Sequence, residues 1–179
     1  MDATEVIEFW FQEIDSKFWW VKDSNFDETL RQRFLDTHKK ARQGELNSWR
    51  VSALGRLAEI IVLDQFSRNM FRDAPQAFAY DGMALVLAQE SISLKVEDQL
   101  TNQQKSFLFM PFMHSESKAI HEKAVELFSQ SGLEGNLDFE LQHKKIIDRF
   151  GRYPHRNKIL GRKSTPEELA FLKEPGSSF

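Results

Sequence analysis

Apolar residues recur at helical spacing along nearly the whole chain. In the first segment, Val6, Ile7, Trp10, Phe11 and Ile14 follow the three-and-four spacing of an amphipathic helix. Similar stripes follow, and no pair of segments shows the alternation of apolar and polar residues that predicts paired strands. The pattern therefore predicts an all-α chain of about eight helices.

Helix caps and helix breakers divide this pattern into separate elements. Ser24 or Asn25 is suited to cap a second helix, which ends near Gly44. A third helix carries apolar residues over positions 51–66. Pro75 fits the first turn of a fourth helix, where its missing N–H is no loss.

The second half of the chain has equally clear signals. A helix over residues 137–150 ends at Gly151, and the run Ser164–Glu168 combines a cap, a proline and two acids at the start of the last helix. No linker rich in Pro, Gly or Ser interrupts the middle of the chain. We therefore expect one all-helical domain over residues 1–179, with a frayed tail at about residues 173–179.

The composition permits a core and excludes several kinds of site. Of 179 residues, 41% are hydrophobic and none is cysteine. The missing cysteine excludes a disulfide framework, a thiolate metal site and a cysteine nucleophile. The acidic N-terminus lacks an export signal, and the longest apolar run, Phe107–Met113, is far shorter than the ~20 residues of a membrane span. We expect no membrane partner and a cytoplasmic location.

Charge is unevenly distributed along the chain, whose formal net charge is −3. Residues 143–163, the basic segment, hold eight basic side chains and one acidic one, which gives this segment +7 and leaves −10 for the rest. Such crowding of cations is unfavourable unless anions lie nearby, and these can be internal carboxylates or a ligand. The negative remainder would repel a polyanion, so we do not expect nucleic acid as a partner.

A short pattern occurs twice, each time at the end of an apolar helix. Asp64–Arg68 reads D-Q-F-S-R and is followed by Arg72, and Asp148–Arg152 reads D-R-F-G-R and is followed by Arg156. On a continuing helix, Asp64 and Arg68 share one face and can pair. The repeat predicts two related helical hairpins, with chance similarity as the alternative. The arginines either tie helices together or bind an anionic ligand, and the sequence leaves both open.

The second copy of the pattern opens a turn that is rich in cations. Gly151 and Pro154 end the helix there. Four cation-capable side chains lie within eight residues, namely Arg149, Arg152, His155 and Arg156. Arginine binds a carboxylate or a phosphate through a planar fork. Internal carboxylates and a bound ligand are both open as their partners.

Histidines and carboxylates offer the remaining chemistry. His114 and Glu116 flank a predicted helix cap, where they could act in acid–base chemistry or complete the cap. Glu140 and His143 match Glu-x-x-His, but a di-iron site needs a second copy and two further glutamates, so we expect no metal. No nucleotide- or cofactor-binding motif occurs, and we expect no cofactor. Two further histidines are expected on helix surfaces, His38 and His121.

Four segments of the sequence together resemble a known family. They are VIEFWF, LDQFSRNMFRDAPQAFAYD, FLFMPFMHSES and HKKIIDRFGRYPHRNKILGRKSTPEELAFL, and they span Val6 to Leu172. With these segments the chain resembles the bacterial domain-of-unknown-function (DUF) family 924. The resemblance implies an all-helical, tetratricopeptide-like fold, with antiparallel helical hairpins in a right-handed superhelical arrangement. It carries no established activity over to this chain.

The resemblance also points to recurrent polar positions. These are Asp64, Gln65, Arg68, Asn69, Asp81, His114, Ser115, Glu116, His143, Arg149, Arg152, His155, Arg156 and Asn157. Ser67 stands where proline is common in the family, a change that could relax the turn before Arg68. The resemblance implies that these polar blocks converge in space, and it does not name a ligand.

We therefore expect a helical binding domain with one polar pocket that is rich in arginine and histidine. The expected ligand is a small anion or an acidic peptide. The expected walls are the end of the third helix, the corner at Met113–Glu116 and the turn at Arg149–Asn157. The candidate ligand-binding residues are Asp64, Arg68, Arg72, His114, Glu116, His143, Arg149, Arg152, His155, Arg156 and Asn157.

Two other functions stay open from the sequence. An enzyme would use His114 or His143 as acid or base, with Asp64 or Glu116 to orient it. It predicts an imidazole within ~3 Å of a carboxylate, beside an open pocket. A protein–protein scaffold predicts an exposed apolar patch larger than about a few hundred Å². The sequence also leaves the oligomeric state open.

Overall fold

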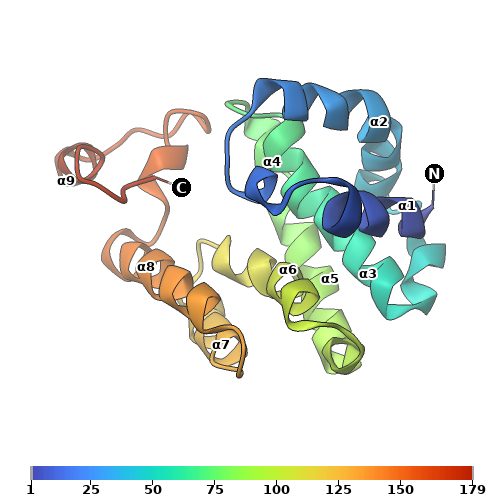
Figure 1. Cartoon of the computed structure of the whole chain (residues 1–179). Helices are drawn as coiled ribbons and strands as arrows, with labels where there is room; N and C mark the ends of the chain where they lie inside the picture. Colours follow the sequence, from blue (N-terminus) through green and yellow to red (C-terminus); the bar gives the residue numbers. More distant parts are fainter. Residues whose placement is uncertain (1, 179) are drawn as a thin grey trace. The chain divides into compact units, whose positions relative to one another are not determined.

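Helices joined by short turns make up residues 2–178, the part of the chain that the computed structural model describes (Figure 1). These residues contain no strand, which confirms the prediction of an all-α chain of about eight helices. They divide into two compact units, residues 2–72 with 76–111 and residues 73–75 with 112–178. The single domain and the superhelical arrangement stay predictions. Phe179, the last residue of the predicted frayed tail, lies outside the described residues.

The N-terminal part of the chain supplies the helices of the first unit. Its α-helices are α1 (Ala3–Glu8), α2 (Ser24–Arg42), α3 (Ala53–Ile61), α4 (Ser67–Met70), α5 (Asp81–Ser93) and α6 (Asn102–Met113), of which the last two residues belong to the second unit. Shorter 3-10 and π-helical segments are η1 (Phe9–Glu13), η2 (Ser16–Trp19), η3 (Asn47–Val51), η4 (Val62–Phe66), η5 (Pro75–Ala77) and η6 (Val96–Gln99). Helix α3 packs against both α1 and α5 (Figure 1).

Two predicted helices have different boundaries in the structure. The segment predicted as one helix over 51–66 begins with the 3-10 segment η3, continues as α3 and becomes the π-helical η4. Pro75 begins only the short η5, and the long helix starts at Asp81. The fixed φ of proline suits a 3-10 turn as well as an α-helix, so the residue alone did not decide between them.

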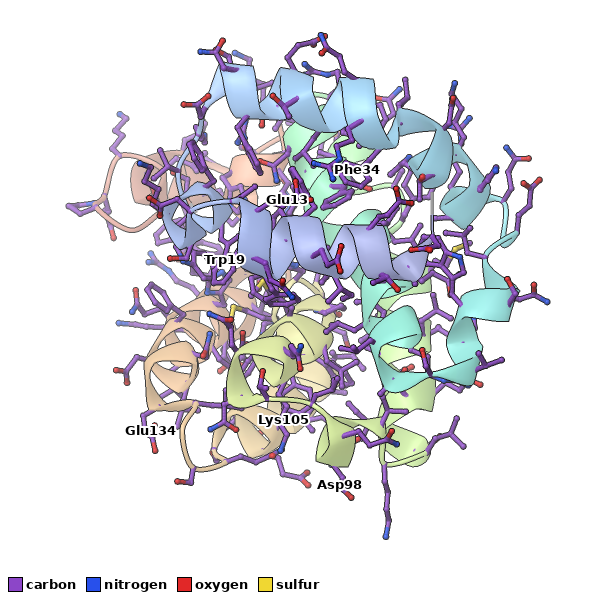
Figure 2. All side chains as sticks on the ribbon, turned by 45° about the vertical axis from the view of Figure 1, so that its right-hand side comes forward. Glu13, Trp19, Phe34, Asp98, Lys105 and Glu134 are labelled. Atoms are coloured by element: carbon purple, nitrogen blue, oxygen red, sulfur yellow. The ribbon has the colours of Figure 1, made fainter. Side chains whose placement is uncertain are left out.

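Aromatic side chains fill the core of the first unit. Phe9, Trp10 and Phe66 are at most 3% exposed, and the Trp10 ring lies 5.5 Å from that of Phe66. Phe34 of α2 completes the group, with its ring 4.9 Å from Phe66. Figure 2 shows Phe34 on α2 and Trp19 on η2. These ring contacts attach the N-terminal segment to α2 and η4.

The second unit consists of a helical hairpin and a C-terminal segment. Its elements after α6 are α7 (Lys118–Phe128), α8 (Glu134–Phe150), η7 (Pro154–Arg156) and α9 (Pro166–Phe171). Helices α7 and α8 pack side by side (Figure 1). Gly151 ends α8 with a φ of 69°, a backbone conformation that favours glycine. Thr165 and Glu168 form a capping box at the start of α9, as the sequence predicts.

Among the described residues, no helix combines the length and the apolar character that a membrane span requires.

Candidate functional site

The candidate residues divide between the two units. Asp64, Arg68 and Arg72 lie in the first unit, and the other eight lie in the second. Each group has its own set of contacts. That the two groups converge in one pocket stays a prediction.

Asp64 lies in η4 between α3 and α4, and it is 1% exposed. Its Oδ1 lies 3.0 Å from Nη1 of Arg68, which confirms the predicted pairing of these two residues. Arg68 also donates to both carboxylate oxygens of Asp81, at 2.9 and 3.0 Å. Because Asp81 begins α5, this guanidinium connects η4 and α4 with α5.

Arg72 makes a similar contact with α2. Its Nε and Nη2 donate to the two carboxylate oxygens of Asp27, each at 2.7 Å. Nη2 also donates to Oδ1 of Asn69 at 3.0 Å. Asp27 is buried, so this guanidinium satisfies a carboxylate that has left water. The three candidate residues of the first unit therefore favour the interpretation as ion pairs that connect helices.

A pocket in the first unit lies away from these ion pairs. It has a volume of about 380 Å³, and it is lined by the start of α1, by Ser52–Gly55 and by Gln99. This lining contains no candidate residue. The pocket therefore does not support the predicted anion site.

Three arginines of the basic segment pair with carboxylates from outside that segment. The pairs are Arg149–Glu167 at 2.9 Å, Arg152–Glu168 at 2.6 and 2.8 Å, and Arg162–Glu116 at 2.6 and 2.9 Å. The charge of +7 in the basic segment is thus opposed by glutamates that lie before and after it. Internal carboxylates, one of the two alternatives left open by the sequence, account for these three side chains.

Glu168 is the most strongly bonded of these carboxylates. It is 2% exposed, and it accepts hydrogen bonds from Arg152, from Thr165 N–H at 2.7 Å and from Nδ2 of Asn157 at 3.2 Å. The hydrogen bonds from Arg152, followed by those from Thr165 and Asn157, lower the pKa of Glu168 to about 2. Asn157 also accepts from Nε of Arg162 at 2.9 Å, so this candidate residue connects two ion pairs.

Protonation of Glu168 is expected to weaken the fold in acid. Its pKa is lower in the folded chain than in the unfolded chain, so its contribution to stability is present above about pH 4.5 and is lost as the pH falls toward 2. Glu168→Gln should lower the free energy of unfolding at neutral pH by about 2 kcal/mol and should flatten its decline in acid. Urea unfolding at several pH values measures both effects. Glu167→Gln is the matched control, because its pair with Arg149 is exposed. Equal acid dependence in wild type and Glu168→Gln would contradict this account.

Glu116 is bonded to the turn that follows α8. Its Oε1 accepts the N–H of Tyr153 at 2.7 Å, and both oxygens accept from Arg162. Burial acts to raise the pKa of Glu116, but the hydrogen bonds from Arg162 and Tyr153 outweigh burial and lower it. The low pKa and the bidentate contact indicate a fixed carboxylate, not a general base.

The remaining candidates gather around the ring of Tyr153, which is fully buried. We call this group the Tyr153 cluster: the rings of His143 at 5.9 Å and His155 at 5.7 Å, and the Arg156 guanidinium at 4.6 Å over the ring face. Arg156 is 4% exposed, whereas His155 is half-buried. The cluster brings two imidazoles and one cation onto a single aromatic side chain.

His143 is neutral in this cluster. Burial lowers its pKa to about 3, and its Nδ1 lies 2.7 Å from the carbonyl oxygen of Phe139. Because a carbonyl only accepts, Nδ1 carries the proton of the neutral ring. His114, His121 and Arg156 act in the same direction as burial on the pKa of His143, so the half-buried His114 belongs to the surroundings of the cluster.

The sequence missed a buried pair beside this cluster. His121 and Glu140 are both fully buried, and Nδ1 of His121 lies 2.6 Å from Oε1 of Glu140. The prediction that His121 lies on a helix surface is wrong, and so is that for His38, which is also fully buried. Helical spacing was the available signal, since His121 continues the stripe of Ala124 and Phe128.

The family model described as bacterial protein of unknown function (DUF924) matches residues 6–176. This chain belongs to the DUF924 family. A solved structure, described as that of a protein of unknown function from Agrobacterium tumefaciens, is similar to this chain, with a TM-score of 0.90 and 36% sequence identity. The similarity covers 96% of each chain. A search of curated proteins gives no match.

These comparisons confirm the predicted family and the all-helical fold, and they assign no activity. Within residues 2–178 of this DUF924 chain, no group of three or more histidines or carboxylates could hold a metal ion.

Proposed function

We propose that this chain is a binding domain for a small ligand that carries a carboxylate or a phosphate, and that the Tyr153 cluster binds this ligand. The observation that supports the proposal most directly is the position of Arg156, whose buried guanidinium stacks on Tyr153 beside two imidazoles. A guanidinium in a site of low dielectric constant interacts strongly with an anion and fits the planar carboxylate.

The other arginines define where such a ligand would bind. Arg149, Arg152 and Arg162 each contact a glutamate of the same unit, which assigns them to the stability of the fold. His143 is neutral, and the Arg156 guanidinium brings positive charge to the cluster, which would attract an anionic group of the ligand. His155 is half-buried, so the cluster reaches solvent at this side chain.

An enzyme is not favoured by the same geometry. Acid–base chemistry requires an imidazole close to a carboxylate and open to a substrate. One imidazole–carboxylate pair of the second unit is His121–Glu140, and both of its side chains are fully buried. His143 bonds to a backbone carbonyl, and Glu116 bonds to Arg162. Binding therefore explains the cluster better than catalysis does.

Ligand binding can be tested by thermal unfolding with inorganic phosphate, with acetate and with a short peptide rich in aspartate and glutamate. Phosphate or acetate should raise the melting temperature in proportion to the logarithm of its concentration once the site is saturated. Arg156→Lys keeps the positive charge but removes the planar guanidinium, which can donate two parallel hydrogen bonds to one anion. It should weaken binding by about 10-fold or more.

Arg149→Lys is the matched control, because Arg149 lies in the same basic segment but forms an exposed pair with Glu167. It should leave the anion-dependent shift unchanged. Equal stabilisation of wild type and Arg156→Lys would contradict the site, and so would the absence of stabilisation by either anion. Stabilisation by the acidic peptide alone would replace the small-anion proposal with a peptide-binding one.

A further inference from the structure

Side chains of the second unit donate hydrogen bonds to the two carbonyls on either side of His114. The hydroxyl of Tyr153 donates to the Met113 carbonyl at 2.5 Å. On the other side, Nε2 of His121 lies 2.8 Å from the Ser115 carbonyl. Because that carbonyl can only accept, Nε2 of His121 carries a proton. We call the segment Met113–Ser115 the His114 corner.

The second ring nitrogen of His121 faces Glu140. Nδ1 lies 2.6 Å from Oε1, and both side chains are fully buried. A nitrogen and an oxygen at this distance have a proton between them. That proton belongs either to Glu140, which makes both groups neutral, or to His121, which makes the contact an ion pair.

The surroundings of Glu140 favour the neutral form. Its other oxygen, Oε2, is buried and accepts no hydrogen bond from the described residues. A carboxylate would lose the hydration of this oxygen without compensation, whereas the carbonyl oxygen of a carboxylic acid loses much less. Burial also raises the pKa of Glu140, against the opposing effects of His121 and Lys144. The Lys144 ammonium itself contacts the carboxylates of Glu122 and Asp148.

We propose that Glu140 is a carboxylic acid that donates to a neutral His121, and that loss of this one proton changes which groups bind the His114 corner. The pair would work as a pH-operated hydrogen-bond switch. The proposal does not depend on the proposed anion site, because it requires no ligand.

The switch follows from the donors and acceptors present. When Glu140 loses its proton to solvent, its carboxylate faces the lone pair of Nδ1 at 2.6 Å, which is repulsive. The imidazole relieves this by exchanging its proton from Nε2 to Nδ1, which then donates to the carboxylate. One proton leaves the pair, and the ring stays neutral with one N–H.

The new tautomer removes both donors from the His114 corner. Nε2 of His121 no longer donates to the Ser115 carbonyl, and it becomes an acceptor. The Tyr153 oxygen already lies 3.2 Å from Nε2, so its O–H can turn from the Met113 carbonyl to this nitrogen. Two discrete hydrogen-bond patterns around one corner make a bistable element.

Other titratable or charged groups of the second unit lie on the same helices as this pair, at the corner before them and on the following turn. They are His114 at the corner, Glu122 on α7, His143, Lys144 and Asp148 on α8, and Arg156 in η7. His143, with a pKa of about 3, stays neutral throughout a titration at higher pH. Lys144 is the cation that acts on Glu140, and it favours loss of the proton.

Long-range proton–nitrogen NMR of uniformly ¹⁵N-labelled protein can test the switch, between about pH 5 and pH 10. The His121 ring is assigned by its absence in His121→Gln. At low pH, we expect Nε2 protonated and Nδ1 unprotonated, in at least about 10-fold excess, and at high pH the reverse. A doubly protonated ring at low pH would overturn the proposal in favour of an ion pair. A tautomer that stays the same over the whole range would overturn the switch.

Glu140→Gln provides the locked form, because its amide N–H₂ can donate to Nδ1 and does not titrate. The variant should show the Nε2-protonated tautomer at every pH. Glu126→Gln is the matched control, since Glu126 lies on α7 with an exposed side chain, and it should keep the wild-type inversion. An inversion that persists in folded Glu140→Gln would overturn the role of Glu140. If this variant does not fold, the wild-type titration decides alone.

Discussion

Phe66→Ala is expected to lower the free energy of unfolding by about 3–5 kcal/mol. Phe66 is fully buried, and its ring lies 4.9 Å from Phe34, 5.5 Å from Trp10 and 6.2 Å from Phe9. Three rings from two other parts of the chain therefore lose their contacts with Phe66. These large side chains cannot move into the space that the deleted ring leaves, so a cavity remains. Urea unfolding followed by circular dichroism measures the loss.

The control for this substitution is the equivalent position of the second D-x-F-x-R pattern. Phe150 is half-buried, with its ring 5.0 Å from Phe171 and the Arg149 guanidinium 4.7 Å from it. Because less area leaves water there, Phe150→Ala should cost only about 1–2 kcal/mol. Equal losses of the free energy of unfolding at the two positions would contradict the larger contribution that we assign to the aromatic core around Phe66.

Gly55→Ala is expected to lower the free energy of unfolding by about 3 kcal/mol or more, although alanine is the better helix former. A Cβ atom at Gly55 would lie 1.9 Å from the carbonyl oxygen of Trp49 and 2.8 Å from its carbonyl carbon. These are backbone atoms of η3, so α3 or η3 must move to make room. The hydrogen bond from Gly55 N–H to Oγ of Ser52, which caps α3, would be strained by the same movement.

Gly82 supplies the matched control in the same unit. It lies in the first turn of α5, and a Cβ atom there would have no neighbour within 4 Å. Gly82→Ala should raise stability by about 0.5–1 kcal/mol, because it reduces the freedom of the unfolded chain at no steric cost. Thermal and urea unfolding of both variants give the comparison. If Gly55→Ala leaves the free energy of unfolding unchanged or raises it, then η3 can move away from the added Cβ atom at little cost, which contradicts the prediction.

The sequence predicted the helices well and their irregular segments poorly. The start of α9 at Thr165 and the end of α8 at Gly151 depend on residues within one turn of each boundary, and both were predicted. The π-helical η4 was not, since its apolar residues, Val62, Leu63 and Phe66, continue the apolar stripe of α3. In a π-helix each backbone hydrogen bond spans one residue more than in an α-helix, and this difference hardly changes the spacing of the apolar residues.

The candidate site was predicted in part. The sequence identified the arginines, and it identified Asp64 as a partner of Arg68 because the two are four residues apart. It did not identify Asp27 as the partner of Arg72, because 45 residues separate them. It left open whether internal carboxylates or a ligand oppose the basic segment, and glutamates from before and after this segment contact three of its arginines.

Sequence by itself determined the all-helical class, the family and some helix ends, such as those at Gly151 and Thr165. These properties depend on spacing and capping over a few residues, or on long matching segments. Only the tertiary structure decided which charges are compensated and which imidazoles are buried. Arg162 meets Glu116 across 46 residues, and His121 meets Glu140 across 19. Such pairings arise when helices pack, because burial and distance in space set the strength of an ionic contact and the location of a proton.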